Sequence, residues 1–428
     1  MNTAYRELRA NGDIFVALGL VGCLIFSSWP LTALSLFLFL ILVTSNCSSI
    51  LDSINSYNFS LFKTNRGIYY NAKILCTVLL MIPIYVHNDG LSGLETPAKT
   101  LLVAYIIVMN IDRFRWKVLL CGTSAGALLA LTFGLFQVGL YVADRSGGAT
   151  NPIRFGMIAL ALGSICAVGL LYSHNDRRMA ALSFAGFCAG IGGAFLSGSR
   201  GAMLALPFML LLLAPVLWRR SSRALLMIPV FMLILAGALL VGNVGKMSTR
   251  IATAYTNISM GLTGGEAAMD DRSVGDRTKL LFMAFRLFEQ HPAFGVGANG
   301  WNDESARLAA APDPNDRITY SYNQAHNQYA DDLAKGGIFR FLLGFINLFL
   351  PLYLFLKCEP FADKKGSEFA LAGVIVSLSF MIFSLSESLM ILSLPAMVHA
   401  MLTFYLLAAC DEARRKSDLD KARAVAAT

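Results

Sequence analysis

The stretch "GGIFRFLLGFINLFLPLYLFL", residues 336–356, decides the fold of this chain. It is almost entirely apolar, and a helix of that length rises about 30 Å, the thickness of the hydrocarbon core of a bilayer. Similar runs recur along the 428 residues, of which 56% are hydrophobic and only 14% charged. A soluble protein carries more charge than this. We therefore predict an all-α polytopic membrane protein.

About twelve apolar runs are long enough to cross the membrane as helices. The predicted spans are 13–29, 31–46, 68–86, 98–111, 117–142, 153–173, 179–196, 201–217, 223–243, 336–356, 368–384 and 390–409.

One long segment separates the spans into two groups. We predict a bundle of nine spans over residues 1–243, a large outer loop over 244–335, three further spans over 336–410 and a charged tail over 411–428. Within the loop, residues 276–290 have the spacing of an amphipathic helix, with Leu280, Ala284 and Phe285 on its apolar side. We expect that helix to lie on the membrane surface or to cap the bundle.

The distribution of positive charge predicts the orientation, because short loops rich in Lys and Arg stay on the cytoplasmic side. With both termini cytoplasmic, most lysines and arginines fall in cytoplasmic segments. The short outer loops then hold only Lys99, Arg145, Arg154 and Arg200. The net charge of +8 reflects this bias, and we do not interpret it as nucleic-acid binding.

Three stretches with unusual polar residues each begin a helix at the outer surface. In "NPIRFG", Asn151 can cap the helix and Pro152 suits its first turn, and in "SGSRGA" Ser199 can cap the next one. The third helix begins near His326, in "TYSYNQAHNQYADDLAKGG", residues 319–337. The N–H groups at such helix starts attract anions.

Arginines accompany these helix starts. Arg154, Arg200 and Arg277 carry guanidinium groups that bind phosphate oxygens in pairs. Together with the helix starts they predict an anion site at the outer interface. Each has a simpler interpretation: Arg154 can extend to lipid headgroups, and Arg277 can be an ordinary solvated charge. Likewise His326 can be a loop residue, and Glu387, in a short outer turn, can serve only as a structural hydrogen-bond acceptor.

No residue pattern predicts a metal site. Asp270 and Asp271 are adjacent acids, but no histidine or further acid stands at metal-ligand spacing from them. The histidines are scattered and form no H-E-x-x-H pattern. We therefore predict no metal and no cofactor.

An outer anion site without a nucleotide-binding fold favours a phosphate-bearing substrate that arrives through the membrane, such as a polyprenyl-diphosphate-linked sugar. Sugar transfer releases a diphosphate, whose developing charge fixed guanidinium groups can stabilise in place of a metal. The acceptor hydroxyl must also lose a proton. A neutral imidazole suits that task, so His326 is the candidate base.

The segments "SGSRGA", "DRTKLLFMAFRLFEQHPAFGVGANGW" and "AHNQYADDLAKGGIFR" resemble the signature segments of the superfamily of O-antigen ligases and O-antigen polymerases. The resemblance covers roughly residues 150 to 390. It implies a membrane-embedded glycosyltransferase of the C-type architecture that inverts the sugar without a metal. By similarity, Arg200 and Arg277 hold the donor diphosphate and His326 activates the acceptor. We add Arg154 to the donor group, and the predicted supporting residues are Ser199, Gln324, Asn327, Tyr329 and Glu387.

Three activities compete within this superfamily: ligation of O-antigen to lipid A core, extension of O-antigen on its carrier, and transfer of a glycan to protein. The chain lacks an extra soluble C-terminal domain and has one dominant outer loop after the ninth span, which favours the ligase. A non-enzymatic alternative is a transporter of the same lipid-linked glycan. We disfavour it because the centres of the spans are nearly free of charge and no repeat is visible.

The ligase interpretation implies specific partners and a location. The donor is O-antigen linked to undecaprenyl diphosphate, the acceptor is lipid A core oligosaccharide, and membrane lipids surround both. The expected location is the bacterial inner membrane, with the active site facing the periplasm.

Overall fold

A computed structural model describes residues 3–23, 64–220 and 272–426, apart from 112, 141, 142, 144, 149, 174, 314–316 and 363. Every regular element in these segments is helical. The α-helices are α1 (Thr3–Gly22), α4 (Asn65–Leu79), α5 (Met81–His87), α6 (Glu95–Asn110), α7 (Trp116–Gly139), α8 (Pro152–Tyr172), α9 (Arg177–Ser197), α10 (Arg200–Arg220), α13 (Arg272–Gln290), α14 (Gly297–Ala309), α15 (Gln328–Leu356), α16 (Ser367–Phe383) and α17 (Ser393–Ala426), and the short 3-10 helices are η2 (Leu91–Leu94) and η4 (Leu389–Ile391).

Within the described residues, 7 helices or helix pairs are long and apolar enough to cross a membrane. They are Asn65–His87, Leu91–Val108, Trp116–Gly139, Pro152–Tyr172, Arg177–Ser197, Gln328–Leu356 and Ser393–Val425. The helices α10 and α16 are apolar but shorter. The predicted spans 31–46 and 223–243 lie outside the described residues, so the number twelve remains a prediction.

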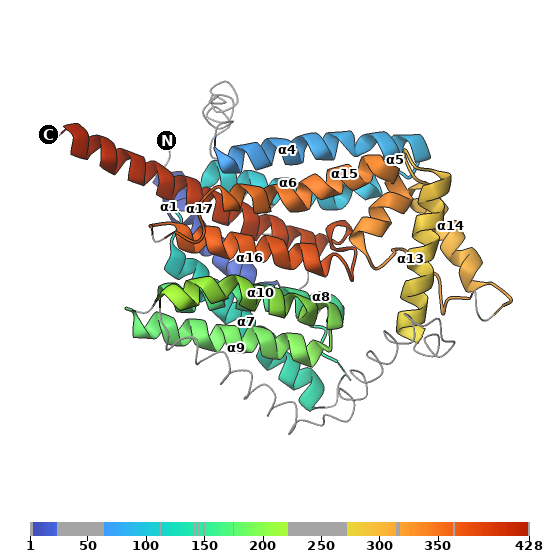
Figure 1. The fold of residues 1–428 in the computed structure, drawn as a ribbon, viewed down its shortest axis with the longest axis horizontal. Helices are drawn as coiled ribbons and strands as arrows, with labels where there is room; N and C mark the ends of the chain where they lie inside the picture. The colour runs from blue at the N-terminus through green and yellow to red at the C-terminus, as the bar shows by residue number, and fades with distance from the viewer. Residues whose placement is uncertain are drawn as a thin grey trace.

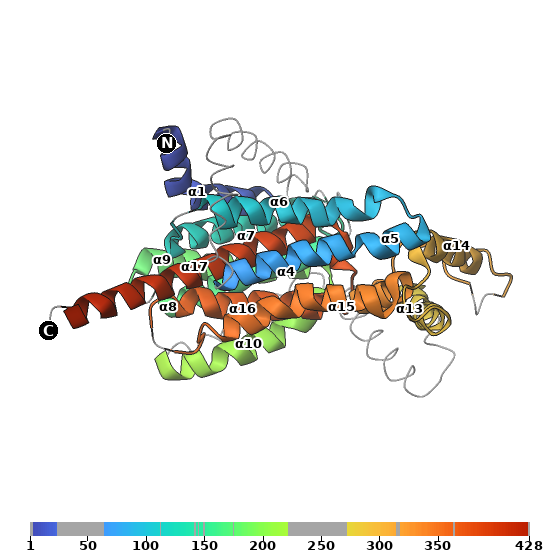
Figure 2. The same cartoon turned by 90° about the horizontal axis from the view of Figure 1, so that it is seen from above.

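The long helices pack side by side, and the soluble-looking elements gather at one end (Figure 1). Helices α13 and α14 lie across that end, whereas the start of α1 and the end of α17 lie at the opposite end in both views (Figures 1 and 2). We call the α13–α14 end the capped end. The amphipathic helix predicted over 276–290 therefore exists, as α13, and caps the bundle.

The packing of α13 differs in detail from the predicted face. Leu280 and Ala284 are buried as expected, together with Trp301 of α14 and Ala334 of α15. Phe285, however, is 46% exposed. The side that packs against α14 and α15 is therefore rotated away from Phe285.

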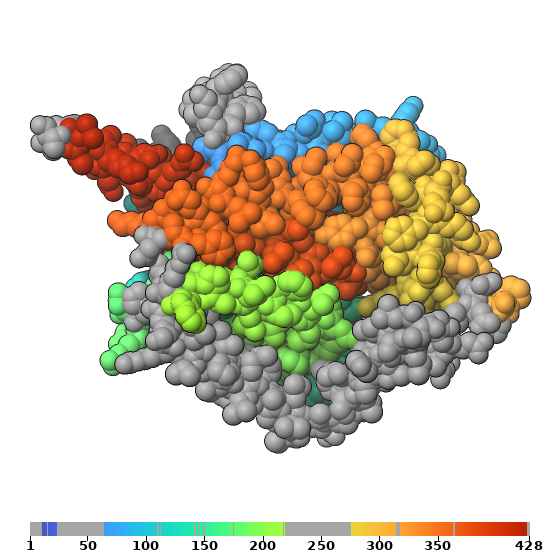
Figure 3. Space-filling view, viewed as in Figure 1, coloured from blue at the N-terminus to red at the C-terminus, as the bar shows by residue number. Residues whose placement is uncertain are grey.

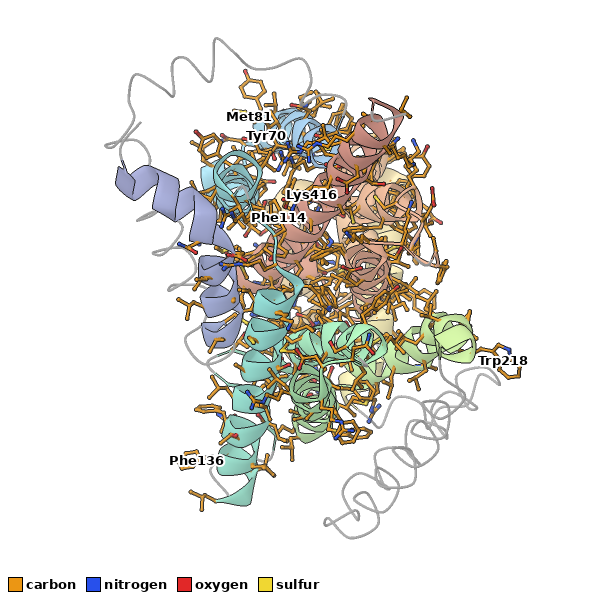
Figure 4. The ribbon with its side chains drawn as sticks, turned by 90° about the vertical axis from the view of Figure 1, so that its left-hand side faces the viewer. Tyr70, Met81, Phe114, Phe136, Trp218 and Lys416 are labelled. Carbon is orange, nitrogen blue, oxygen red and sulfur yellow. The ribbon has the colours of Figure 1, made fainter. Side chains whose placement is uncertain are left out.

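The interior of the bundle is centred on α8, which packs against α7, α9, α10 and α16. Its residues from Phe155 to Gly169 are all buried. Large apolar side chains also lie on the outer surface: Phe136 and Trp218 point away from the bundle (Figure 4) and are 55% and 78% exposed. Exposed aromatic side chains of this kind suit contact with lipid.

The predicted helix caps are confirmed. Asn151 Oδ1 accepts a hydrogen bond from Ile153 N at 2.8 Å, and α8 begins at Pro152. Ser199 Oγ accepts from Ala202 N at 3.3 Å, where α10 begins. These side chains satisfy N–H groups that a helix start leaves without a partner.

The span predicted over 336–356 matches the part of α15 that follows a break in the helix, and α15 itself begins earlier, at Gln328, close to the helix start predicted near His326. Its first turns hold charged residues that sequence reasoning assigned to the outer loop, but these residues are buried and paired with one another. The helix also breaks at Gly337, where φ is +61° and ψ −160°. Only glycine adopts that backbone readily, and a Cβ there would overlap the backbone of Ala293.

Two predicted domain boundaries fall inside helices. The one at 335/336 lies within α15. The one at 410/411 lies within α17, which continues through the charged residues to Ala426 and protrudes from the bundle (Figure 1).

Candidate functional site

A buried carboxylate lies at the centre of the candidate site. Glu387 follows α16 in the turn 384–388 and is 1% exposed. Its Oε1 accepts a hydrogen bond from Gln324 Nε2 at 2.7 Å, and its Oε2 lies 2.9 Å from His326 Nδ1. Two residues of the loop before α15 thus share one acid from a segment some sixty residues away in sequence.

A guanidinium group approaches the same carboxylate from α8. The Nε atom of Arg154 lies 3.8 Å from Glu387 Oε1, an ion pair longer than a hydrogen bond. Arg154 stands in the first turn of α8, which Asn151 caps. The arginine therefore lies next to Glu387, but this carboxylate does not form a hydrogen bond with its Nε–H.

These neighbours keep Glu387 ionised. Burial by itself raises the pKa of this carboxyl, but the hydrogen bond and charge of His326, the hydrogen bond from Gln324 and the charge of Arg154 outweigh burial, so the pKa lies below its ordinary value. An ionised carboxylate can only accept hydrogen bonds, so the facing His326 Nδ1 is the N–H donor. In a neutral imidazole held this way, Nε2 is the unprotonated nitrogen that a base requires.

The backbone at His326 is held in an uncommon conformation. Its φ is +52°, in the left-handed region where few residues other than glycine are found. Residues in that region are often held at functional sites by their surroundings. The imidazole is 15% exposed, and the Tyr322 ring meets it edge-on at 5.4 Å.

Tyr322 connects the histidine to α13. Its hydroxyl donates to Asp276 Oδ2 at 2.8 Å, and Asp276 also accepts from Thr319 N. The pKa of the Tyr322 hydroxyl is raised by burial and by its neighbours Tyr320 and Asp276, so it remains a donor. Arg277 is the next residue on α13 and is half-buried, so the helix that carries it is fixed to the His326 loop.

The start of α10, where Arg200 stands, packs closely against the turn that carries Glu387. A Cβ at the following residue, Gly201, would overlap the hydroxyl of Ser386 in the turn 384–388. Only glycine allows α10 to start this close to the turn that carries Glu387. Figure 3 shows α10 beside the segment that contains α16, with α13 at one end of the same face. The side chain of Arg200 is exposed.

The predicted supporting residues have mainly positioning contacts. Asn327 caps α15 by accepting from Tyr329 N at 3.0 Å and Ala330 N at 3.1 Å, and its Nδ2 donates to Leu385 O. The hydroxyl of Tyr329 donates to Met381 O at 3.0 Å. Both contacts fasten the start of α15 to the end of α16 and its turn.

The structure thus brings Arg154, Gln324, His326 and Glu387 into direct contact. It places Arg200 at the start of α10 and Arg277 in the second turn of α13, and no hydrogen bond or ion pair among the described residues joins either arginine to His326.

Sequence reasoning missed other residues that shape this site. Arg145 Nε donates to Ser197 O at 2.8 Å, which holds the turn before α10. Asp331 Oδ1 accepts from Ala325 N at 3.0 Å, and Lys335 Nζ donates to Asn323 O at 2.7 Å, which holds the His326 loop. The spacing of Asp331 and Lys335 on one helix face was a usable signal.

Among the described residues, no group of three or more His, Cys, Asp or Glu side chains is placed to hold a metal ion. The predicted donor-binding residues at this end, Arg154, Arg200 and Arg277, carry guanidinium groups, which bind anions.

A comparison with protein families finds one match: residues 184–345 fit the family described as O-antigen ligase. No curated protein matches the chain. The matched segment contains Arg200, Arg277 and His326. Arg154 and Glu387 lie outside it and are placed beside His326 by the structure alone.

Proposed function

We propose that this chain is an O-antigen ligase, a function supported by the match of residues 184–345 to the family described as O-antigen ligase. In this proposal it transfers O-antigen from undecaprenyl diphosphate to a sugar hydroxyl of lipid A core, in the periplasmic leaflet of the bacterial inner membrane. The observation that carries the proposal is His326, held by the buried Glu387 beside Arg154 at the end of the bundle where α10 and α13 begin.

The proposed base is His326 Nε2. As the acceptor oxygen attacks the anomeric carbon, Nε2 takes the hydroxyl proton and the ring becomes a cation. Glu387 stabilises that cation through Nδ1–H, at 2.9 Å, and fixes the orientation of the ring. The carboxylate remains ionised throughout, which its lowered pKa favours.

The proposed electrophilic groups are the arginines. The acceptor oxygen bonds to the anomeric carbon on the face opposite the diphosphate, so the configuration inverts. The bond from that carbon to the phosphate oxygen breaks, and its electron pair stays on undecaprenyl diphosphate. Arg200, Arg277 and Arg154 would stabilise this developing charge, as positive groups already in place at the start of the reaction. The account therefore needs no metal.

A product assay tests the proposal. Purified protein is reconstituted with lipid-linked O-antigen and lipid A core, and the products are separated by mass. A ligase yields O-antigen joined to core, in the presence of a chelator as well. A longer chain on undecaprenyl diphosphate would identify a polymerase instead, and glycan on an added protein acceptor an oligosaccharyltransferase. Movement of intact donor across the membrane without a new bond would identify a transporter.

A further inference from the structure

A cavity lined by both apolar and charged side chains lies on the other side of α15, away from the candidate site. Its volume is about 280 Å³, and α4, α5, α6, α15 and the start of α17 enclose it. None of Arg154, Arg200, Arg277, His326 and Glu387 lines it. It is therefore a separate space with its own chemistry.

The cavity extends from an exposed mouth to a buried end. Exposed Ser92 and Gly93 line the mouth at the capped end of the bundle, near the start of α14. Along α4 and α5 the lining continues from Ile84 back to Lys73, a distance of about 16 Å for eleven helical residues. A ligand that enters at the mouth therefore reaches deep into the membrane-spanning part.

The buried end holds a cation. Lys73 is 8% exposed, and its Nζ donates to Asn347 Oδ1 at 2.8 Å. None of the ion pairs found among the described residues joins Lys73 to a carboxylate, so an amide oxygen is the polar partner that the structure gives it. A buried charged side chain inside a membrane span is costly and marks a functional site. An anion is the ligand that compensates it.

A second cation lines the same space. Arg340 Nε donates to Asp332 Oδ1 at 2.9 Å, and its Nη2 lies 3.9 Å from Asp331 Oδ2, beyond hydrogen-bond distance, which leaves further N–H donors on the guanidinium group. Gln328 also donates to Asp332 Oδ2 at 3.0 Å, so both oxygens of that carboxylate have donors within the fold. Asp89, at the mouth, accepts from the backbone of Ala298 and Asn299. The acids are thus engaged, whereas Lys73 and Arg340 keep donors for an anion.

Hydroxyl and amide groups complete the lining. Thr96 and Thr100 of α6 line the cavity together with Asn347, and the two threonine hydroxyls donate to Ile391 O and Pro97 O. The cationic side chains are therefore the principal groups for an anion, and a lysine is a common phosphate ligand. The volume approaches that of small-ligand sites, about 300 Å³ or more. We propose that this cavity binds a phosphate group, with Lys73 and Arg340 as its cationic ligands.

Hydrogen bonds of Gln328 connect this cavity to the turn of the candidate active site. The side chain of Gln328 lines the cavity, accepts from Met390 N at 2.7 Å, and its backbone N–H donates to Ser384 O at 2.8 Å. The turn that carries Glu387 lies between those two partners. The inference itself stands on the cavity and does not require the proposed function.

Thermal unfolding of the purified protein tests the site and distinguishes two sources of phosphate. One arm compares nanodiscs of phosphatidylglycerol and phosphatidylcholine, and the other adds inorganic phosphate to protein in neutral detergent. Stabilisation by phosphatidylglycerol alone identifies an anionic lipid headgroup, and stabilisation by inorganic phosphate identifies a soluble phosphate. Either result supports the site, provided that the apparent affinity for the stabilising phosphate falls about tenfold or more in Lys73→Gln.

Two further variants control for folding and for general charge. Ser92→Trp fills the exposed mouth without touching the buried end, and we expect it to weaken the same stabilisation. Lys117→Met removes an exposed lysine outside the cavity, and we expect no change. Equal stabilisation of wild type and folded Lys73→Gln and Ser92→Trp, equal loss in Lys117→Met, or no stabilisation in either arm would overturn the proposal.

Discussion

Two clusters of charged residues flank the His326 loop and differ in how completely their charges are paired. In the first, Glu387 is shared by His326 at 2.9 Å and Arg154 at 3.8 Å. In the second, Asp331 and Lys335 form a buried ion pair at 2.9 Å. The second pair also holds the loop backbone at both ends, and Lys335 lies over the Trp301 ring at 5.4 Å. We call them the Glu387 cluster and the Asp331 cluster.

This difference distinguishes residues that we expect to take part in the reaction from residues that we expect to stabilise the fold. In the Asp331 cluster Asp331 and Lys335 pair with each other and both bind the backbone of the His326 loop, so the loss of either should reduce stability. In the Glu387 cluster His326 Nε2 receives no hydrogen bond from a described residue, and Arg154 is not saturated, so its loss should reduce catalysis. The variants below test this division, from the largest expected effect to the smallest.

His326→Ala should show the largest effect, with glycan transfer reduced about 10⁴-fold and donor binding retained, because the proton acceptor is gone. Transfer is measured with the reconstituted protein, and binding with the lipid-linked donor. His326→Asn removes the base but tolerates the left-handed backbone, and His291→Ala is an exposed histidine control. Transfer at the wild-type rate by folded His326→Asn would refute the assignment of the base.

Lys335→Met should be the most destabilising substitution. It leaves buried Asp331 with only the more distant Arg340, at 3.9 Å, which costs about 3–5 kcal/mol and is measured as a fall in the thermal midpoint. The exposed pair of Lys364 and Glu359 is the control, since Lys364→Met should cost less than about 1 kcal/mol. If the two variants unfolded at the same temperature, the Asp331 cluster would not be a support.

Glu387→Gln should lower the turnover rate about a hundredfold with little change in the KM for donor, because the amide no longer fixes and stabilises the imidazole. Stability gives a second measurement. Since the pKa of Glu387 is lowered, its ionised form stabilises the fold above the ordinary pKa of glutamate, and that contribution is lost as pH falls through the lowered value. The thermal midpoint of wild type should therefore fall more than that of Glu387→Gln over this acidic range. Parallel acid profiles would argue against an ionised, paired Glu387.

Arg200→Lys should reduce transfer about tenfold or more, since an ammonium group does not reproduce the paired donors of a guanidinium. The measurement is the rate at saturating acceptor across donor concentrations. Arg178→Lys, at the start of α9, is the control. An unchanged rate would show that positive charge alone is enough at this position.

Asn327→Ala should have the smallest effect, a loss of about 1 kcal/mol of stability, because it removes the cap of α15. Thermal unfolding checks it against Asn299→Ala, an exposed asparagine in α14. A loss of several kcal/mol would mean that the bond from Asn327 to Leu385 O contributes more than the cap does.

Local signals predicted much of this arrangement. The helix starts were predicted from Asn151 with Pro152 and from Ser199, and α13 was predicted from the spacing of apolar residues over 276–290. The pairing of His326 with Glu387 was not predictable, because it depends on how two segments pack across the bundle. The burial of Asp331 and Lys335 was not predictable for a related reason: they look like loop residues until each neutralises the other inside the protein.

The cavity behind α15 illustrates the same limit. The spans were judged nearly free of charge, yet Lys73 and Arg340 lie within predicted spans and face one space. A sequence lists charges along one helix at a time, and only packing brings those of α4 and α15 together.

An experimentally determined structure with the lipid-linked donor bound tests the central claim most directly. The account predicts diphosphate oxygens against Arg200 and Arg277, with His326 Nε2 facing the anomeric carbon and Nδ1 still bonded to Glu387. A diphosphate seated elsewhere, with the imidazole turned away from the sugar, would contradict it.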